Sequence, residues 1–214
     1  MCREGYDIMN AMKTRHLSFA VFLLAVRAMP LSSGDYQAKT VAVQPVESYP
    51  ARVTVEQVTV AVDPYANDGK SRTAFDVKDL NSKGYFPAHV IIKNASGNHL
   101  ALRTRNIVLV SPKGQEYYTT PATLVVQDVV GSTSTKSGSP LLDFTSKELT
   151  NLSIEPGTVV NGFVFFYTPE PKKNLFAGSK LHIPSIRDET AQKDLGPFDV
   201  SLDPALPAAE IRKK

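Results

Sequence analysis

Three histidines are the side chains in the main body of this sequence best suited to holding a metal ion. His89, His99 and His182 lie far apart along the chain and share no recognisable ligand spacing. Two of them could bind a metal weakly if neighbouring strands placed them side by side. His89 and His182 alternate with apolar residues and His99 stands beside a turn, so we expect solvated surface side chains and no metal site.

A loop rich in oxygen-bearing side chains could suggest calcium instead. It contains Asp63, Asn67, Asp68 and Gly69. A calcium loop of EF-hand type would need an oxygen ligand where Tyr65 stands, and its glycine comes one place late. We therefore expect a plain turn stabilised by Asp and Asn side chains.

Catalytic chemistry has no recognisable framework in the sequence. There is no Gly-x-Ser-x-Gly elbow, no Ser-x-x-Lys pair and no glycine-rich phosphate loop. Cys2 is the only cysteine, which leaves the body without a disulfide or a thiolate. The acids are scattered, so a glycosidase pair is neither indicated nor excluded; they include Asp76, Asp79, Glu116 and Asp128. We expect a protein that is not an enzyme, with no catalytic or metal residues and no cofactor.

Aromatic residues and two glycosylation patterns leave further alternatives open. An aromatic platform for a ligand could be built from four residues, although core packing explains them equally well. These are Tyr85, Phe86, Tyr117 and Tyr118. Asn94-Ala95-Ser96 and Asn151-Leu152-Ser153 match the acceptor pattern, which matters only in a eukaryotic secretory pathway. We attribute the two patterns to chance.

The body that must position these side chains is expected to be made of strands. The chain has 214 residues, 42% of them hydrophobic and 21% charged, which is typical of a globular protein. Its formal net charge of +3 gives no reason to expect nucleic acid as a partner. β-Branched and aromatic runs separated by Pro and Gly predict about seven short strands in a sandwich or barrel.

Alternation assigns faces to several of these strands. Val90 and Ile92 are predicted to face the core, whereas His89 and Lys93 face away from it. Residues 162–167 are apolar on both faces, which predicts a central strand, and the regular alternation of residues 198–203 predicts one near an edge.

One strand changes phase part-way along its length. Valines alternate up to Val55 and again from Val58, but the phase flips across Glu56-Gln57. One extra residue at that point would restore a single buried face, so we expect a β-bulge there.

The N-terminus has the three parts of a signal peptide. Lys13 and Arg15 precede the ten-residue apolar run 17–26, and small residues follow at Ala28 and 32–34. The run is shorter than the about 20 residues that span a bilayer, and no lipobox cysteine follows it. A buried helix or a short anchor is the alternative, and Met12 is a plausible true start.

These boundaries divide the chain into four parts. We expect a signal peptide over residues 1–34, an extended linker over 35–52, an immunoglobulin-like antiparallel β-sandwich over 53–203, and a tail over 204–214. The protein is then exported to the periplasm or secreted. It carries neither a lipid anchor nor a transmembrane helix once the signal peptide is removed.

Three stretches of the sequence resemble a known group of proteins. They are residues 86–96 (a strand followed by Asn-Ala-Ser), 152–157 with 162–166 (Pro-Gly, then Gly-x-x-x-Phe), and 183–188 with 197–200. They are similar to bacterial exported immunoglobulin-like sandwiches of the DUF4352 and LEA14 types, over roughly residues 53–203. The resemblance implies the fold and carries no chemistry. We expect a non-enzymatic binding or accessory module whose partner is another envelope protein. The alternatives are a hydrolase or small-ligand-binding protein with a dispersed site, and a purely structural domain.

The segment Pro121–Pro140 is expected to be the most individual part. Residues 122–130 are apolar and β-branched, yet fit neither strict alternation nor a helical stripe. One interpretation is an edge strand open to a partner, and the other is a local cover over the sandwich, with residues 131–140 as slack. We expect the segment to contribute to partner binding and to be dispensable for folding.

Overall fold

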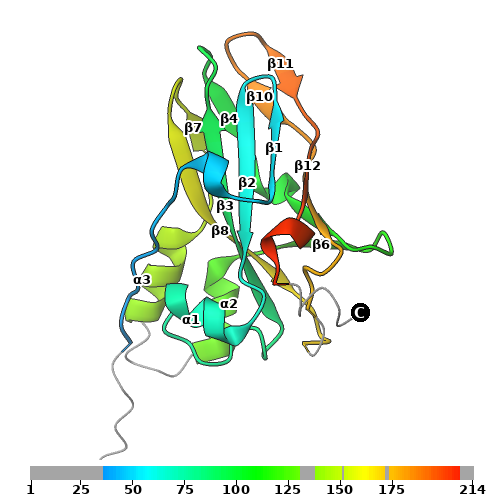
Figure 1. Cartoon of the computed structure of the whole chain (residues 1–214). Helices are drawn as coiled ribbons and strands as arrows, with labels where there is room; N and C mark the ends of the chain where they lie inside the picture. Colours follow the sequence, from blue (N-terminus) through cyan, green and yellow to red (C-terminus); the bar gives the residue numbers. More distant parts are fainter. Residues whose placement is uncertain (1–35, 131–137, 151, 172–173, 208–214) are drawn as a thin grey trace, which may run out of the picture. The chain divides into compact units, whose positions relative to one another are not determined.

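The computed structural model describes residues 36–130, 138–150, 152–171 and 174–207. This part of the chain contains twelve β-strands and three short α-helices (Figure 1). The strands form two antiparallel sheets, so the all-β prediction is confirmed, although the strands outnumber the about seven expected. The predicted signal peptide lies outside the described residues.

The larger sheet has eight strands in the order β1-β2-β3-β8-β6-β5-β9-β12. Their bounds in that order are Arg52–Val55, Val58–Pro64, Tyr85–Asn94, Val159–Tyr167, Glu116–Thr120, Val108–Val110, Lys180–Ile183 and Phe198–Ser201. The smaller sheet, in the order β11-β10-β4-β7, comprises Lys193–Leu195, Ile186–Asp188, Leu100–Leu102 and Leu152–Ile154. The helices are α1 (Asp68–Ala74), α2 (Ala122–Val130) and α3 (Gly138–Lys147). Three 3-10 turns complete the set: η1 (Val46–Ser48), η2 (Thr104–Asn106) and η3 (Asp203–Ala205).

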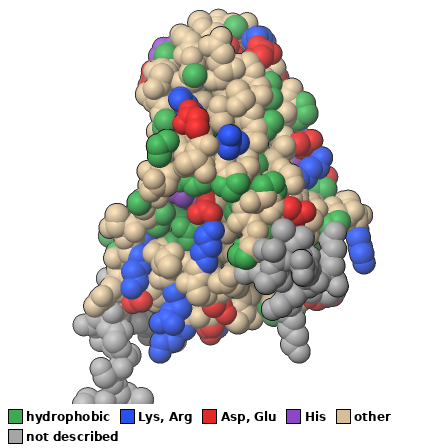
Figure 2. Space-filling view, viewed as in Figure 1, with side chains coloured by type: hydrophobic (Ala, Val, Ile, Leu, Met, Phe, Trp, Pro, Cys, Tyr) green, Lys and Arg blue, Asp and Glu red, His purple; other side chains and the backbone are tan. Residues whose placement is uncertain are grey.

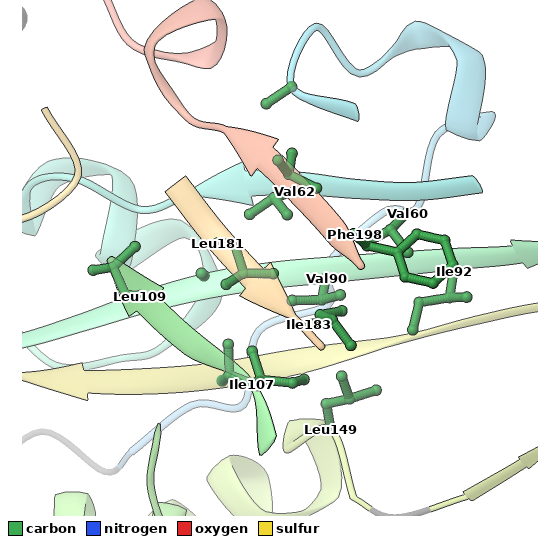
Figure 3. Close-up of a cluster of buried hydrophobic side chains, with 14 of the residues drawn as sticks. Val60, Val62, Val90, Ile92, Ile107, Leu109, Leu149, Leu181, Ile183 and Phe198 are labelled. Atoms are coloured by element: carbon green, nitrogen blue, oxygen red, sulfur yellow. The ribbon is translucent and has the colours of Figure 1, made fainter. Parts of the chain in front are cut away.

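The larger sheet curls until its two outer strands, β1 and β12, lie beside each other (Figure 1). Aliphatic side chains fill the space enclosed by the curl, and Val90 and Ile92 are fully buried there, as predicted (Figure 3). Leu181, Ile183 and Phe198 join them from the far end of the sheet. We call this cluster the aliphatic core. Residues 162–167 were predicted to form a central strand, and they lie in β8, inside the sheet. Residues 198–203 were predicted to lie near an edge, and β12 is the last strand of the ladder. Both predictions are confirmed.

The change of phase after Val55 comes from a tight turn, so the predicted β-bulge is wrong. Glu56 and Gln57 both have positive φ, 45° and 68°, and Val55 pairs directly with Val58. Two left-handed residues in succession make the mirror-image turn that suits a two-residue hairpin. Residues opposite each other in such a hairpin share a face, which explains the flip without an extra residue.

Strand β3 is buried on both faces. Its second face meets an aromatic cluster built from Phe75, Phe144, Phe163 and Phe165, with centroid distances such as 4.2 Å between Phe75 and Phe144. We call it the aromatic core. Further along the same face, Ile91 packs with residues that precede β1.

Helix α2 replaces the edge strand considered for residues 122–130, and that interpretation is wrong. Ala122, Val125 and Val126 are buried on the aromatic core at the spacing i, i+3, i+4, which is a helical stripe. Packing against β8 and α3 outweighs the strand preference of the valines. The segment therefore covers a face of the sheet, which was the other interpretation; residues 131–137 lie outside the described part.

The segment expected as a linker, residues 35–52, contacts the body over its described part before β1 (residues 36–51). The Tyr36 hydroxyl donates to Asp143 Oδ2 at 2.6 Å, and Val46 and Tyr49 are buried against Ala61 and Ile91. Within the described ranges, no helix is long and apolar enough to cross a membrane.

Candidate functional site

A pocket of about 650 Å³ lies between the turn that joins β5 to β6 and the chain that follows β8. Ligand pockets in proteins commonly measure roughly 300–1,000 Å³ and are mostly apolar with a few polar groups. This one fits that description. Its apolar lining comes from Pro112, Tyr117, Pro169, Leu175 and Ala177, and its polar lining from Ser111, Lys113, Gln115, Thr168, Glu170, Asn174 and Ser179.

The pocket opens where β6 and β8 diverge. The two strands pair only through Thr119 with Phe166 and Thr120 with Phe165. Before that point β6 pairs with β5 on its other side. After it the chain beyond β8 stays beside β3, since the Thr168 N–H donates to Gly84 O at 2.9 Å. Pro169 has no N–H and cannot extend the ladder toward β6.

Gly84 makes this divergence sterically feasible. Its φ is +91°, and a Cβ at this position would lie 2.2 Å from Thr168 O. Only glycine adopts such a backbone and allows so close an approach without strain. Next to it, the rings of Tyr85 and Tyr167 lie 5.1 Å apart, so the end of β8 is held on the β3 side of the fork.

The β5–β6 turn forms the outer wall and is fixed by its own hydrogen bonds. The Ser111 N–H donates to Gln115 O at 2.8 Å, and the Gly114 N–H donates to Ser111 O at 2.9 Å. The Gln115 N–H donates to Ser111 Oγ at 3.0 Å. Pro112 and Lys113 are consequently presented to solvent at the tip of the turn.

The floor is tied to the aliphatic core. Leu175 is 8% exposed and belongs to that core. The Ser179 hydroxyl donates to Leu175 O at 2.7 Å, and the Gly178 N–H donates to Asp203 Oδ1 at 2.6 Å. This floor is therefore anchored both to the core and to η3.

Few charged side chains line the pocket. The described lining contains one lysine, one carboxylate and no histidine. A glycosidase mechanism needs two carboxylates at a set separation. Elsewhere on the face seen in Figure 2, acidic and basic side chains are interspersed, with no broad surface of a single sign.

The structure separates the three histidines, and one of them departs from its prediction. His89 is 2% exposed, so its prediction as a surface residue is wrong. Its ring stacks on Phe163 at 4.6 Å, and Nε2 lies 2.9 Å from Asn161 Oδ1. Burial lowers the pKa of this imidazole.

The other two histidines have separate partners near the surface. His99 Nδ1 lies 2.9 Å from Glu155 Oε2, and His182 Nδ1 lies 2.7 Å from Asp199 Oδ1. Within the described ranges, no three His, Cys, Asp or Glu side chains gather as metal ligands would.

The side chains of the acidic loop cap and brace α1. Asn67 Oδ1 accepts from the Lys70 N–H at 2.9 Å, the usual role of an N-cap residue. Asp68 Oδ1 accepts from the Asn81 N–H at 2.7 Å, and Lys70 Nζ lies 2.5 Å from Asp63 Oδ1. The plain turn predicted here is therefore wrong in part, because Asn67 is the N-cap of α1 and Asp68 and Gly69 begin that helix.

The four scattered acids stay apart, each with its own neighbour. Asp76 accepts from the Gln37 N–H and Asp79 pairs with Lys83, while Glu116 accepts from the Tyr118 hydroxyl and Asp128 from that of Tyr85. The backbone hydrogen bond from Gln37 holds the pKa of Asp76 below its usual value.

The four aromatic residues considered as a platform do not share a surface. Tyr85 packs in the aromatic core and Phe86 in the aliphatic core, while Tyr118 is 64% exposed. Tyr117 alone of the four lines the pocket.

Asn94 is an unsuitable glycosylation acceptor. Its side chain is fully buried, and its Nδ2 donates to Asn98 O at 2.8 Å and to Ile154 O at 3.2 Å. Asn151 lies outside the described residues.

Sequence reasoning missed most of the pocket. Of the lining residues, the sequence singles out only Tyr117. One available signal was the Pro169-Glu170-Pro171 run directly after the predicted central strand, because prolines end pairing where a strand would otherwise continue.

No protein-family model matches this chain, and no curated protein matches it by sequence. The resemblance to DUF4352-type and LEA14-type sandwiches therefore stays a prediction.

Solved structures that resemble the chain include three bacterial proteins. The yjhA protein of Bacillus subtilis is 12% identical over 63% of this chain and 78% of its own, with a TM-score of 0.37. The ycdA protein of Bacillus subtilis, named as a candidate lipoprotein, is 14% identical over 72% of this chain and 39% of its own, at 0.38. A functionally unknown protein from Listeria monocytogenes is 14% identical over 76% and 98%, at 0.34. Likenesses this distant assign no function to the chain.

Proposed function

We propose that this protein is a non-enzymatic, exported binding module of the cell envelope, and that it holds part of another envelope component in the pocket beside β6. The observation that carries the proposal is the pocket itself, which is ligand-sized and mostly apolar. A preformed cavity lowers the cost of binding, because little has to be ordered when the partner arrives.

Binding is favoured over catalysis by the chemistry of the lining. Nucleophile, base and orienting group must lie within hydrogen-bond reach of one another in a hydrolase. The ionisable or nucleophilic side chains in the described lining are those of Lys113, Glu170, Tyr117 and a few hydroxyls. Of these, the Ser179 hydroxyl is engaged with the backbone carbonyl of Leu175.

Export is supported by the order of basic, apolar and small residues before residue 35. Intact mass of the protein recovered from the periplasm or medium is expected to begin near Met29 or Asp35. A full-length, membrane-retained chain would contradict this part of the proposal.

The test of the pocket is photo-crosslinking in living cells. A photoreactive phenylalanine analogue placed at Tyr117 should capture a discrete envelope component, and Ala177→Arg, which fills the pocket, should abolish that capture. Ala95→Arg is the matched control, because Ala95 is exposed in the turn after β3. Equal capture by both arginine variants would remove the pocket as the binding site.

A further inference from the structure

We infer that the ligand of this pocket is a short extended peptide, which adds as a strand along the unpaired side of β6 in the fork between β6 and β8. This inference rests on the proposed function and goes further by naming the chemical class of the partner. Strand addition gives affinity through main-chain hydrogen bonds, and an adjacent pocket gives selectivity for one side chain.

The edge of β6 is the first observation that points to a peptide. Residues Glu116–Tyr118 pair with β5 on one side, and the ladder with β8 on the other side covers only Thr119 and Thr120. Successive residues of a strand direct their N–H and C=O groups to alternate sides. Part of the backbone of Glu116–Tyr118 therefore faces the fork, where the described residues supply no ladder partner.

The fork also has room for a chain. The pocket is lined by Tyr117 from β6 and by Thr168 and Pro169 from the opposite side, so it lies between the two diverging chains. A strand needs a neighbour about 4.8 Å away in the hydrogen-bonding direction. Because Thr168 is hydrogen-bonded to Gly84 on the β3 side, no described residue after β8 forms a ladder with Glu116–Tyr118.

The lining indicates which peptide fits. Leu175 and Ala177 form an apolar floor suited to an aliphatic or aromatic side chain. Lys113 is exposed at the tip of the β5–β6 turn, which favours an acidic residue on that side of the peptide. We therefore expect an apolar residue in the pocket with Asp or Glu beside it.

The outer strands of the large sheet are poorer candidates for the same role. β1 and β12 lie beside each other, so each shields the other's edge (Figure 1). At the tip of the β1–β2 hairpin, Glu56 is paired with Lys193 of β11. The start of β6 combines an open ladder with a cavity, and this combination singles it out.

The experiment uses the purified, exported protein and an array of ten-residue peptides that vary an apolar residue and its acidic neighbour. The tightest peptide is then remade with single N-methyl groups, which remove one backbone donor each. Methylation at alternate positions should weaken binding about tenfold, and methylation at the intervening positions should change it little. Amide hydrogen exchange of Glu116 and Tyr118, which alternation directs to the fork, should slow when the peptide is bound.

Protein variants separate this inference from the proposed function. Ala177→Arg should abolish peptide binding, Ala95→Arg should preserve it, and Lys113→Glu should remove the preference for acidic peptides. Peptide binding that is blocked by Ala177→Arg but insensitive to N-methylation at every position would overturn strand addition and leave the pocket function intact. If no peptide binds but crosslinking from position 117 still captures a component, strand addition is likewise overturned and the pocket function stays intact. Loss of both would overturn the proposed function itself.

Discussion

Both faces of β3 are buried over most of the strand, but they were not equally predictable. On one face, Val90 and Ile92 enter the aliphatic core of the curled sheet. On the other, His89 stacks on Phe163 in the aromatic core beneath α2 and α3. The aliphatic core is enclosed by strands of the two sheets, whereas the aromatic core depends on helices that cover the outside of the larger sheet.

This difference shows that alternation reports the side of a strand and not what covers that side. A polar residue between two apolar ones is normally read as solvated, because many antiparallel sheets face water on one side. Here helices cover that second side, so a histidine there is desolvated. The predictions below test whether the aromatic core is as essential as the aliphatic one.

The largest effect is expected from replacing residues 122–139 with a short Gly/Ser turn. The change removes Ala122, Val125 and Val126, all buried on the aromatic core. Losing their burial should cost about 5 kcal/mol or more, enough to unfold a domain of ordinary stability. Urea denaturation followed by fluorescence measures it. The control replaces only residues 131–137 with Gly and Ser at equal length, and a stable 122–139 replacement would show that α2 is dispensable after all.

Two alanine substitutions compare the cores directly. Phe163 is 1% exposed and Ile92 is fully buried, one on each side of the sheet. Phe163→Ala should cost about 3–5 kcal/mol and Ile92→Ala about 2–5 kcal/mol, because both leave cavities. Ring contacts of Phe163 with Tyr65 at 5.1 Å and Phe75 at 4.9 Å add to its loss. A nearly neutral Phe163→Ala beside a costly Ile92→Ala would mean that the helices pack loosely on the sheet.

His89 provides a pH-dependent version of the comparison. Because burial lowers its pKa, the unfolded chain takes up a proton more readily than the folded one. Stability should be greatest above the ordinary histidine pKa of about 6.5 and should fall as pH drops below it toward the lowered folded value. The His89→Leu variant should lack this part of the pH dependence in thermal melts between pH 7.5 and pH 5. Identical slopes for the two proteins would place the imidazole in water.

The smallest effect is expected at Lys93, which was predicted to face away from the core. Its Nζ lies 2.6 Å from Glu47 Oε1, and the side chains are 38% and 62% exposed. Exposed ion pairs contribute little, so Lys93→Ala should leave the denaturation midpoint unchanged within error. A clear loss of stability would mean that residues before β1 depend on this pair for docking.

The site was less predictable than the fold. Turn residues and alternation located most of the strands, because these signals act within a few residues. The pocket depends on two strands that diverge beyond the pair formed by Thr119 and Phe166, residues that are 47 positions apart in the chain. No local pattern encodes that divergence, although Gly84 and Pro169, which permit it, are both visible in the sequence.

By itself the sequence determined the all-β class, the core-facing side of β3, the central place of β8 and the edge position of β12. Each follows from the two-residue period of a strand and from punctuation by Pro, Gly and Asn. Tertiary structure alone decided that residues 122–130 form a helix, that His89 is buried and that a pocket opens beside β6. In all three cases the outcome depends on which segments pack against one another. For residues 122–130, the free energy of that packing exceeds the preference of the valines for a strand.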